Sequence, residues 1–148
     1  MKNLLVTIEF EAHSNLLLAK AKELAVKFDA KIWLIHIAAP ERDFVGYDVG
    51  PDYIRDSRAE ELRSQHRELQ GFAEDLISDG LNAQALLIQG TTTESLLEEA
   101  EKLQCDLIII GHHVRGWVYN LFNKGTDVSL LDKADIPVMI VPFNITED

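Results

Sequence analysis

Cysteine, proline and long hydrophobic runs are scarce in this sequence of 148 residues. It holds one cysteine and four prolines, so an internal disulfide is excluded and a reducing compartment is indicated. The longest apolar runs, 107–110 and 136–141, are far shorter than the roughly 20 residues that span a bilayer. The first residues also lack the apolar segment of a secretory signal. These absences predict a cytoplasmic protein with no membrane anchor.

Positive charge is scarce as well. Fourteen Lys and Arg stand against 25 Asp and Glu, which gives a net charge of −11. Such a chain is repelled by the phosphates of nucleic acid and by anionic membrane surfaces, so neither is expected as a partner. Apolar residues make up 47% of the sequence, enough for a buried core, and the length predicts one domain over residues 1–148.

Short apolar runs alternate with segments of helical spacing along the whole chain. The runs predict strands at 4–8, 31–38, 83–89, 106–110 and 137–141, with helices between them at about 14–28, 53–79, 91–103 and 126–134. In the first helix, Leu17, Ala21, Leu24 and Phe28 are expected to share one buried face. His36, inside the second strand, is expected to be a packed or partly exposed structural residue.

This alternation predicts an α/β fold with a five-stranded parallel sheet and helices on both faces. Such strands can take the order 3-2-1-4-5, which is the order expected here. In that order, the second and third strands are added on one side of the first strand, and the fourth and fifth on its other side, which places a switch point between the first and fourth strands. Ligands of such sheets bind in the crevice outside the carboxyl ends of the strands at this switch point. Those ends lie at Glu9 and Gly111, which marks the expected site.

The motifs of several well-known α/β functions are absent. The first strand lacks the following glycines of a dinucleotide-binding domain. Gly111 and Gly116 have the spacing of a P-loop, but Trp117 stands where its lysine must be. The third strand ends at Gln89, where a phosphoacceptor receiver would want an acid. No serine lies in a G-x-S-x-G turn. We therefore expect no catalytic residue, and any hydrolysis of a bound ligand to be slow at most.

The segment that follows the fourth strand is the strongest candidate for ligand contact. From Gly111 to Thr126 it reads GHHVRGWVYNLFNKGT. Glycine permits close backbone approach, and the amides at a helix start attract anions, so Gly125 and Thr126 predict a phosphate site. A plain turn followed by an N-cap is the alternative, and both stay open here. His112 and His113 are adjacent with no third ligand, so no metal site is predicted.

Taken together, these segments resemble the universal stress protein family over nearly the whole length. The matching segments are the first strand, the LIHI of the second strand, LEEAEKLQCDLIII before Gly111, the following loop, and ADIPVMIVP near the end. The resemblance implies a Rossmann-like fold of the adenine nucleotide alpha hydrolase kind and a regulatory role in stress responses. It also implies that ATP or AMP, with Mg, lies over the crevice.

The resemblance further implies which residues line the pocket. Adenine would lie at the second strand, the ribose at the end of the first strand, and the phosphates on the loop. The residues implied are Glu9, Ile37, Gly111, His113, Val114, Gly125 and Thr126. Arg115 and Lys124 bracket the loop, where the charge of either would offset that of a phosphate. The alternative is that both are solvated cations of the loop.

The loop departs from the pattern of nucleotide-binding members, G-x2-G-x9-G-[ST]. Val114 takes the place of the second glycine, and one extra residue precedes Gly125. Glu9 stands where those members have aspartate. These departures leave an alternative, a homodimeric interaction protein of the same family that binds no nucleotide.

The last strand predicts the assembly. It is short and apolar, and it lies at a sheet edge in the expected order; such edges tend to be paired or covered. Family members commonly dimerise there by antiparallel pairing, so the resemblance implies a symmetric homodimer through the strand from Ile136 to Val141. The alternative is a monomer whose edge is covered by its own tail, residues 143–148.

Overall fold

The computed structural model describes residues 1–10, 14–38, 52–113 and 126–143, with backbone only at 52–56, 113 and 126–129. Strands and helices alternate along these residues. The strands are β1 (Asn3–Thr7), β2 (Lys31–Ala38), β3 (Ala83–Gln89), β4 (Leu107–His113) and β5 (Val138–Phe143). The helices are α1 (Ser14–Phe28), α2 (Asp52–Ser78), α3 (Thr92–Lys102) and α5 (Thr126–Lys133).

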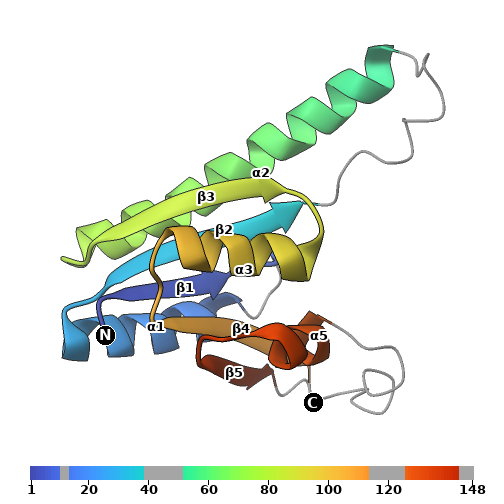
Figure 1. Ribbon diagram of the computed structural model, residues 1–148. Helices are drawn as coiled ribbons and strands as arrows, with labels where there is room; N and C mark the ends of the chain where they lie inside the picture. The colour runs from blue at the N-terminus through green and yellow to red at the C-terminus, as the bar shows by residue number, and fades with distance from the viewer. Residues whose placement is uncertain (11–13, 39–51, 114–125, 144–148) are drawn as a thin grey trace, which may run out of the picture.

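The strands form one sheet in the order β3-β2-β1-β4-β5, and every pair is parallel, as predicted. The arrows of β1, β2, β3 and β5 point the same way in Figure 1. β1 lies in the middle, where Val6 pairs with Leu34 of β2 on one side and with Ile109 of β4 on the other. The switch point therefore lies between β1 and β4, where the sequence placed it.

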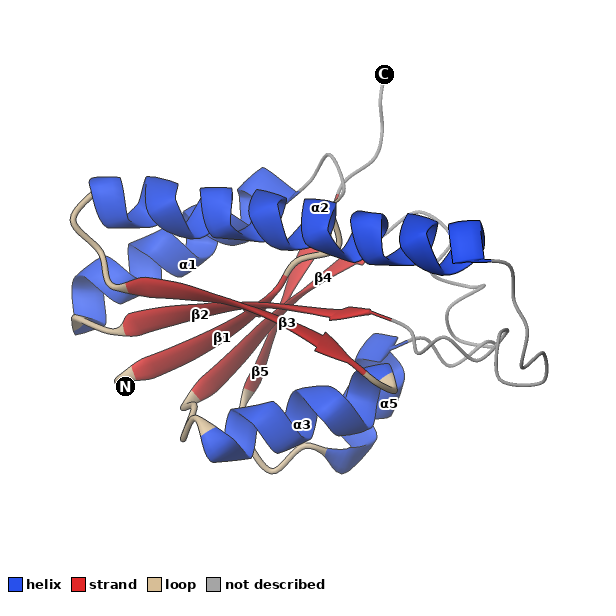
Figure 2. Ribbon diagram, turned by 90° about the horizontal axis from the view of Figure 1, so that it is seen from above, coloured by secondary structure: helices blue, strands red, loops and turns tan. Residues whose placement is uncertain are grey.

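Helices cover both faces of the sheet, with α1 and α2 on one and α3 and α5 on the other (Figure 2). Successive side chains of a strand point to opposite faces. Leu4 and Val6 accordingly belong to the core under α1 and α2, and Leu5 belongs to the core under α3 and α5. All three are fully buried. Burial on both faces explains why the strands read as continuous apolar runs.

The buried face of α1 differs from the predicted one. Leu17, Ala21 and Ala25 are buried, whereas Phe28 is 50% exposed, so its predicted burial is wrong. Ala21 and Ala25 follow Leu17 at intervals of four residues, and their small side chains let the helix lie close to the sheet. Asp29 then adopts a left-handed conformation, φ 54°, which ends the helix just after Phe28.

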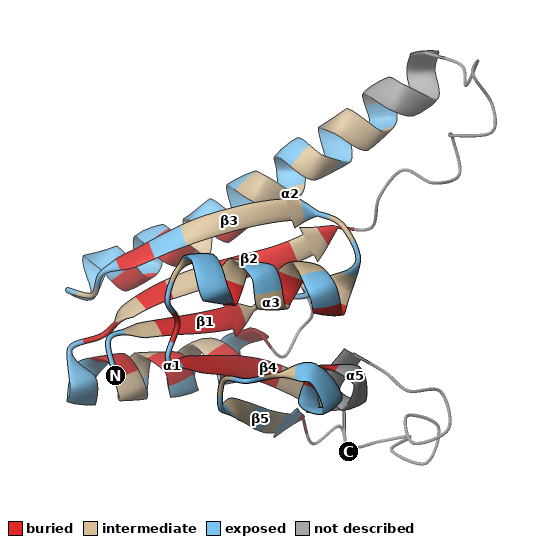
Figure 3. Ribbon diagram, viewed as in Figure 1, coloured by how far each residue is buried: buried red, intermediate tan, exposed pale blue. Residues whose placement is uncertain are grey.

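The second helix is longer than the sheet it covers. Its buried residues, Leu69, Ala73 and Leu76, lie in its C-terminal half, and Leu62 and His66 are only partly buried. Figure 3 shows the N-terminal half of α2 extending past the ends of the strands. Despite this length, none of the helices described is both long and apolar enough to cross a membrane.

The amino ends of β1 and β4 are tied together by Asp106. Its Oδ2 accepts hydrogen bonds from the backbone N–H of Lys2, at 2.6 Å, and of Asn3, at 2.9 Å. These two backbone hydrogen bonds hold the pKa of the Asp106 carboxyl below its ordinary value. The ionised form is therefore the one that favours folding.

Asp106→Ala should lower Tm by a few degrees at pH 7, because both N–H groups lose their acceptor. Since the folded-state pKa is depressed, the stabilisation is present above the ordinary value of 3.8 and is lost as the pH falls through the folded-state value. Thermal unfolding of both proteins from pH 7 to pH 3 checks this. Asp75→Ala, which removes an exposed carboxylate of α2, is the control. A Tm difference that does not narrow at low pH would contradict this account of Asp106.

Candidate functional site

The carboxyl edge of the sheet is uneven at its centre. β1 is five residues long, whereas its neighbours β2 and β4 have eight and seven. Its last pairs are Thr7 with Ile35 on one side and Val6 with Ile109 on the other. β2 and β4 both continue beyond these pairs, so the central strand stops short between two longer ones (Figure 1).

The backbone of Ile37 faces the place where β1 has ended. In a parallel ladder the N–H and C=O groups of alternate residues point to alternate neighbours. Ile35 accepts a hydrogen bond from Ile8 on the β1 side, at 2.9 Å, and Ala38 accepts one from Gly90 on the β3 side, at 3.0 Å. The alternation therefore turns the polar groups of Ile37 toward β1. Within the described residues, no backbone hydrogen bond joins Ile37 to the chain after Thr7.

A buried histidine lies beside this position. His36 is 8% exposed, and its Nδ1 lies 2.7 Å from the carbonyl oxygen of Ile8. Its ring packs against Phe10, with the ring centroids 4.6 Å apart. His36 is thus a packed residue, as expected. Its bond to the end of β1 was not foreseen, and the only sequence signal for it is a polar residue inside an apolar strand.

Gly111 lies within β4, because this strand runs to His113 rather than ending at Ile110 as predicted. A Cβ placed on Gly111 would overlap the ring of Phe143 from β5. Phe143 is 3% exposed and belongs to the core under α1 and α2. With the Phe143 ring in this position, a side chain at position 111 would force the ring to shift, so packing favours glycine there whether or not a ligand approaches.

The other predicted pocket residues are described only in part. Glu9 follows directly after Ile8 and is exposed. The backbone of His113 ends β4, and that of Thr126 begins α5. Four further positions lie outside the described residues, and their roles stay predictions. They are Val114, Arg115, Lys124 and Gly125.

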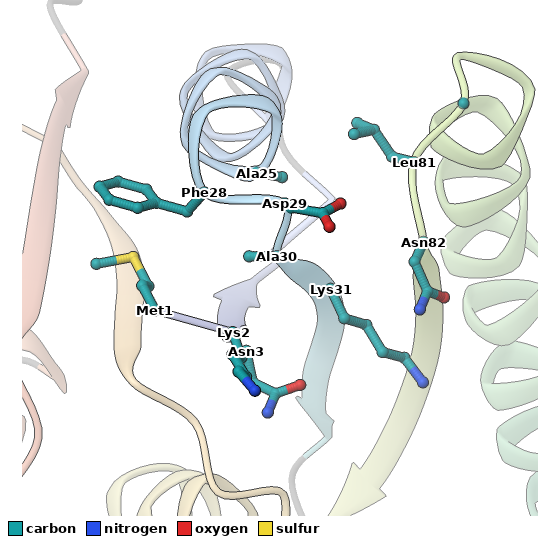
Figure 4. A pocket seen from close by; sticks show the side chains of 11 residues that line it. Met1, Lys2, Asn3, Ala25, Phe28, Asp29, Ala30, Lys31, Leu81 and Asn82 are labelled. Carbon is teal, nitrogen blue, oxygen red and sulfur yellow. The ribbon is translucent and has the colours of Figure 1, made fainter.

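A separate open pocket of about 760 Å³ lies at the opposite, amino edge of the sheet (Figure 4). Its two lysine side chains are Lys2 and Lys31. The ammonium of Lys31 is already engaged, 3.1 Å from Oε1 of Gln84 and 3.8 Å from the centre of the Trp33 ring. This pocket lies away from the switch point and does not add to the candidate site.

Cysteine chemistry and metal binding find no support among the described residues. Cys105 is 7% exposed. Burial, followed by the nearby charge of Asp106, raises the pKa of its thiol to about 11. The reactive thiolate is therefore scarce at neutral pH. In the same part of the chain no three His, Cys, Asp or Glu side chains lie close enough together to hold a metal ion.

Comparison with known proteins gives one consistent result. The model of the universal stress protein family matches residues 1–142. A curated relative from Thermus aquaticus, the universal stress protein in the QAH/OAS sulfhydrylase 3' region, is 28% identical over 142 residues, which cover 95% of this chain and 98% of that protein.

Two solved structures share the fold. The structure of hypothetical protein MJ0577 aligns with a TM-score of 0.78 at 17% identity, over 98% of each chain. A universal stress protein family protein from Arabidopsis thaliana, solved with AMP bound, aligns with a TM-score of 0.64 at 16% identity. This alignment covers 98% of this chain and 94% of the other.

Gly111→Ala should destabilise the protein by roughly 1–3 kcal/mol, because the added methyl group overpacks the Phe143 ring. The loss should be smaller in the Phe143→Leu background, where the ring is absent. Urea unfolding of the two single variants and the double variant measures this coupling. Gly71→Ala is the control, since a Cβ there meets nothing within 4 Å. Equal losses in both backgrounds would exclude Phe143 as the reason for the glycine.

Proposed function

Because the chain belongs to the universal stress protein family, we propose that it is a stress-response regulatory protein that binds an adenine nucleotide at the crevice between β1 and β4. One observation carries the proposal: the N–H and C=O of Ile37 face the gap beyond the end of β1. The pocket implied by the family resemblance has its adenine at this strand. An Arabidopsis protein of the same fold holds AMP.

The chemistry of these groups suits a nucleoside. The Watson–Crick edge of adenine carries an acceptor and a donor side by side, so one residue's N–H and C=O can bind both. A carboxylate accepts hydrogen bonds from hydroxyl groups, which suits Glu9 to the ribose. The backbone amides at the start of α5, from Thr126 onward, suit a phosphate. Binding of this kind regulates without turnover.

AMP and MgATP should each add one nucleotide per chain in native mass spectrometry at millimolar concentration. Glu9→Ala should weaken AMP binding about 10- to 150-fold, the usual cost of losing a hydrogen bond to a charged group. Glu68→Ala, an exposed glutamate of α2, should leave it unchanged. Isothermal titration measures the affinities. A wild-type protein that stays empty at millimolar nucleotide would contradict the proposal.

A second function is favoured by the packing at Gly111. The ring of Phe143 alone accounts for the glycine there, so this glycine is not independent support for a phosphate loop. The departures at Val114 and in the loop length point the same way. A protein that regulates through its surface, without nucleotide, fits these observations. The titrations above separate the two functions.

The outer edge of β5 supports the proposed homodimer. Ile108 donates a hydrogen bond to the carbonyl of Pro137, at 3.0 Å, so residue 137 faces β4. The alternation then turns the polar groups of Val138 and Ile140 away from β4, toward the open edge. Pro142 has the same outward orientation, where its missing N–H costs the β4–β5 ladder nothing. Ile140 is 37% exposed. A second copy of β5 pairing there in antiparallel fashion would use these groups.

Ile140→Pro should convert the dimer into a monomer, because proline removes an outward N–H from the middle of the pairing edge and leaves the β4 ladder intact. Sedimentation velocity at micromolar concentration measures the mass, and circular dichroism checks the fold. Met139→Pro is the contrasting variant. Its N–H faces β4, so it should destabilise the fold itself. A wild-type protein that sediments as a monomer would exclude the dimer.

A further inference from the structure

His36 makes a hydrogen bond that changes how the central strand ends. A carbonyl oxygen only accepts, so the 2.7 Å contact with the oxygen of Ile8 requires a proton on Nδ1 of His36. The two residues are 28 positions apart in the sequence. The imidazole is buried, and its ring lies at 59° to the ring of Phe10. Nothing in the proposed nucleotide contacts uses this side chain.

The acceptor that His36 occupies has a defined place in the sheet. Lys31 and Ile35 of β2 face β1, and their partners there are Lys2 and Ile8. By the same alternation, the next hydrogen bond of the ladder would run from the N–H of Ile37 to the carbonyl of Ile8. In this structure that carbonyl bonds to the imidazole, and Ile8 lies outside β1. Ile37 keeps its pairing with Ile88 of β3 on the other side.

Phe10 also contributes to the end of the pairing between β1 and β2. Its φ is 60°, a left-handed conformation that residues with a Cβ rarely adopt. A residue in this conformation cannot continue the extended backbone of β1, and its ring is in contact with the His36 ring. One buried histidine therefore contacts the residues on either side of Glu9, through the carbonyl of Ile8 and the ring of Phe10.

We propose that His36 is a positioning residue for the nucleotide site. By taking the carbonyl of Ile8, it ends the β1–β2 pairing and keeps the N–H and C=O of Ile37 available to a ligand. It also sets the direction in which Glu9 leaves the strand. The ligand in this inference comes from the proposed function. The effect of His36 on the β1–β2 pairing does not depend on that function.

Two nearly isosteric variants isolate the hydrogen bond. His36→Asn places an amide N–H close to where Nδ1 lies, and His36→Leu has the same size with no donor. Both remove the ring that packs on Phe10, and only His36→Asn keeps a donor for the carbonyl of Ile8. The amide oxygen of the asparagine is also buried at this position, which works against His36→Asn rather than for it. In isothermal titration with AMP, His36→Asn should bind within about threefold of wild type. His36→Leu should bind at least about tenfold more weakly, as expected for losing one or two neutral hydrogen bonds. Equal affinities of the two variants would overturn the inference.

Amide hydrogen exchange tests the strand ending without a ligand, first in the wild-type protein and then in His36→Leu. In the wild-type protein the N–H of Ile37 should exchange much faster than that of Leu34 in the same strand, because it has no acceptor in the sheet. In His36→Leu the Ile37 amide should become protected, since it can then bond to Ile8. Wild-type protection at Ile37 equal to that at Leu34 would overturn the inference, even if His36→Leu fails to fold.

The two experiments also separate this inference from the proposed function. Fast exchange at Ile37 in a protein that binds no AMP would overturn the nucleotide proposal and leave His36 as the residue that ends the pairing. AMP binding by the wild type that His36→Leu leaves unchanged would remove His36 from the site and leave the nucleotide proposal standing.

Discussion

The pairing of β1 with two neighbours is the constraint on which the rest of the structure depends. Its three central residues, Leu4, Leu5 and Val6, are fully buried, so both faces of the sheet must be covered and the helices divide between them. Because β1 is also the shortest strand, the ladders on its two sides end before β2 and β4 do. The place where a ligand can reach backbone groups follows from that difference in length.

The sequence predicted the sheet well because its signals there are local and repeated. The bounds of β2 and β3 agree with the predicted 31–38 and 83–89, since each run is apolar and ends at a clear break. Alternation and handedness favoured a parallel sheet with helices on both faces, because they act on the chain as a whole. They allowed the order 3-2-1-4-5 without fixing it, and the structure has that order. The orientation of α1 was predicted less well. Apolar spacing allowed more than one buried face, and close packing against the sheet selected the alanines over Phe28.

The candidate site could be predicted in position but only partly in detail. A glycine at position 111 is explained equally by a phosphate-binding loop and by the packing of Phe143. The sequence cannot distinguish these explanations, because each favours a residue without a Cβ. The hydrogen bond from His36 to Ile8 joins residues far apart in the chain. The bond depends on which residue ends β1, and the spacing of apolar residues in the sequence does not show that residue. Features set by tertiary contacts, rather than by composition, were the ones that sequence reasoning missed.

Pro142 also bears on how the sheet behaves in a crowded cell. Pro142 has no N–H, so the outer edge of β5 offers few backbone donors to an extended segment of another protein. In the proposed dimer, a short edge is enough, because the second copy pairs with it through an identical strand. Each copy would then cover the outer edge of the other's β5, and a third copy could not pair there. The same residue thereby disfavours open-ended aggregation from this edge while permitting a closed assembly.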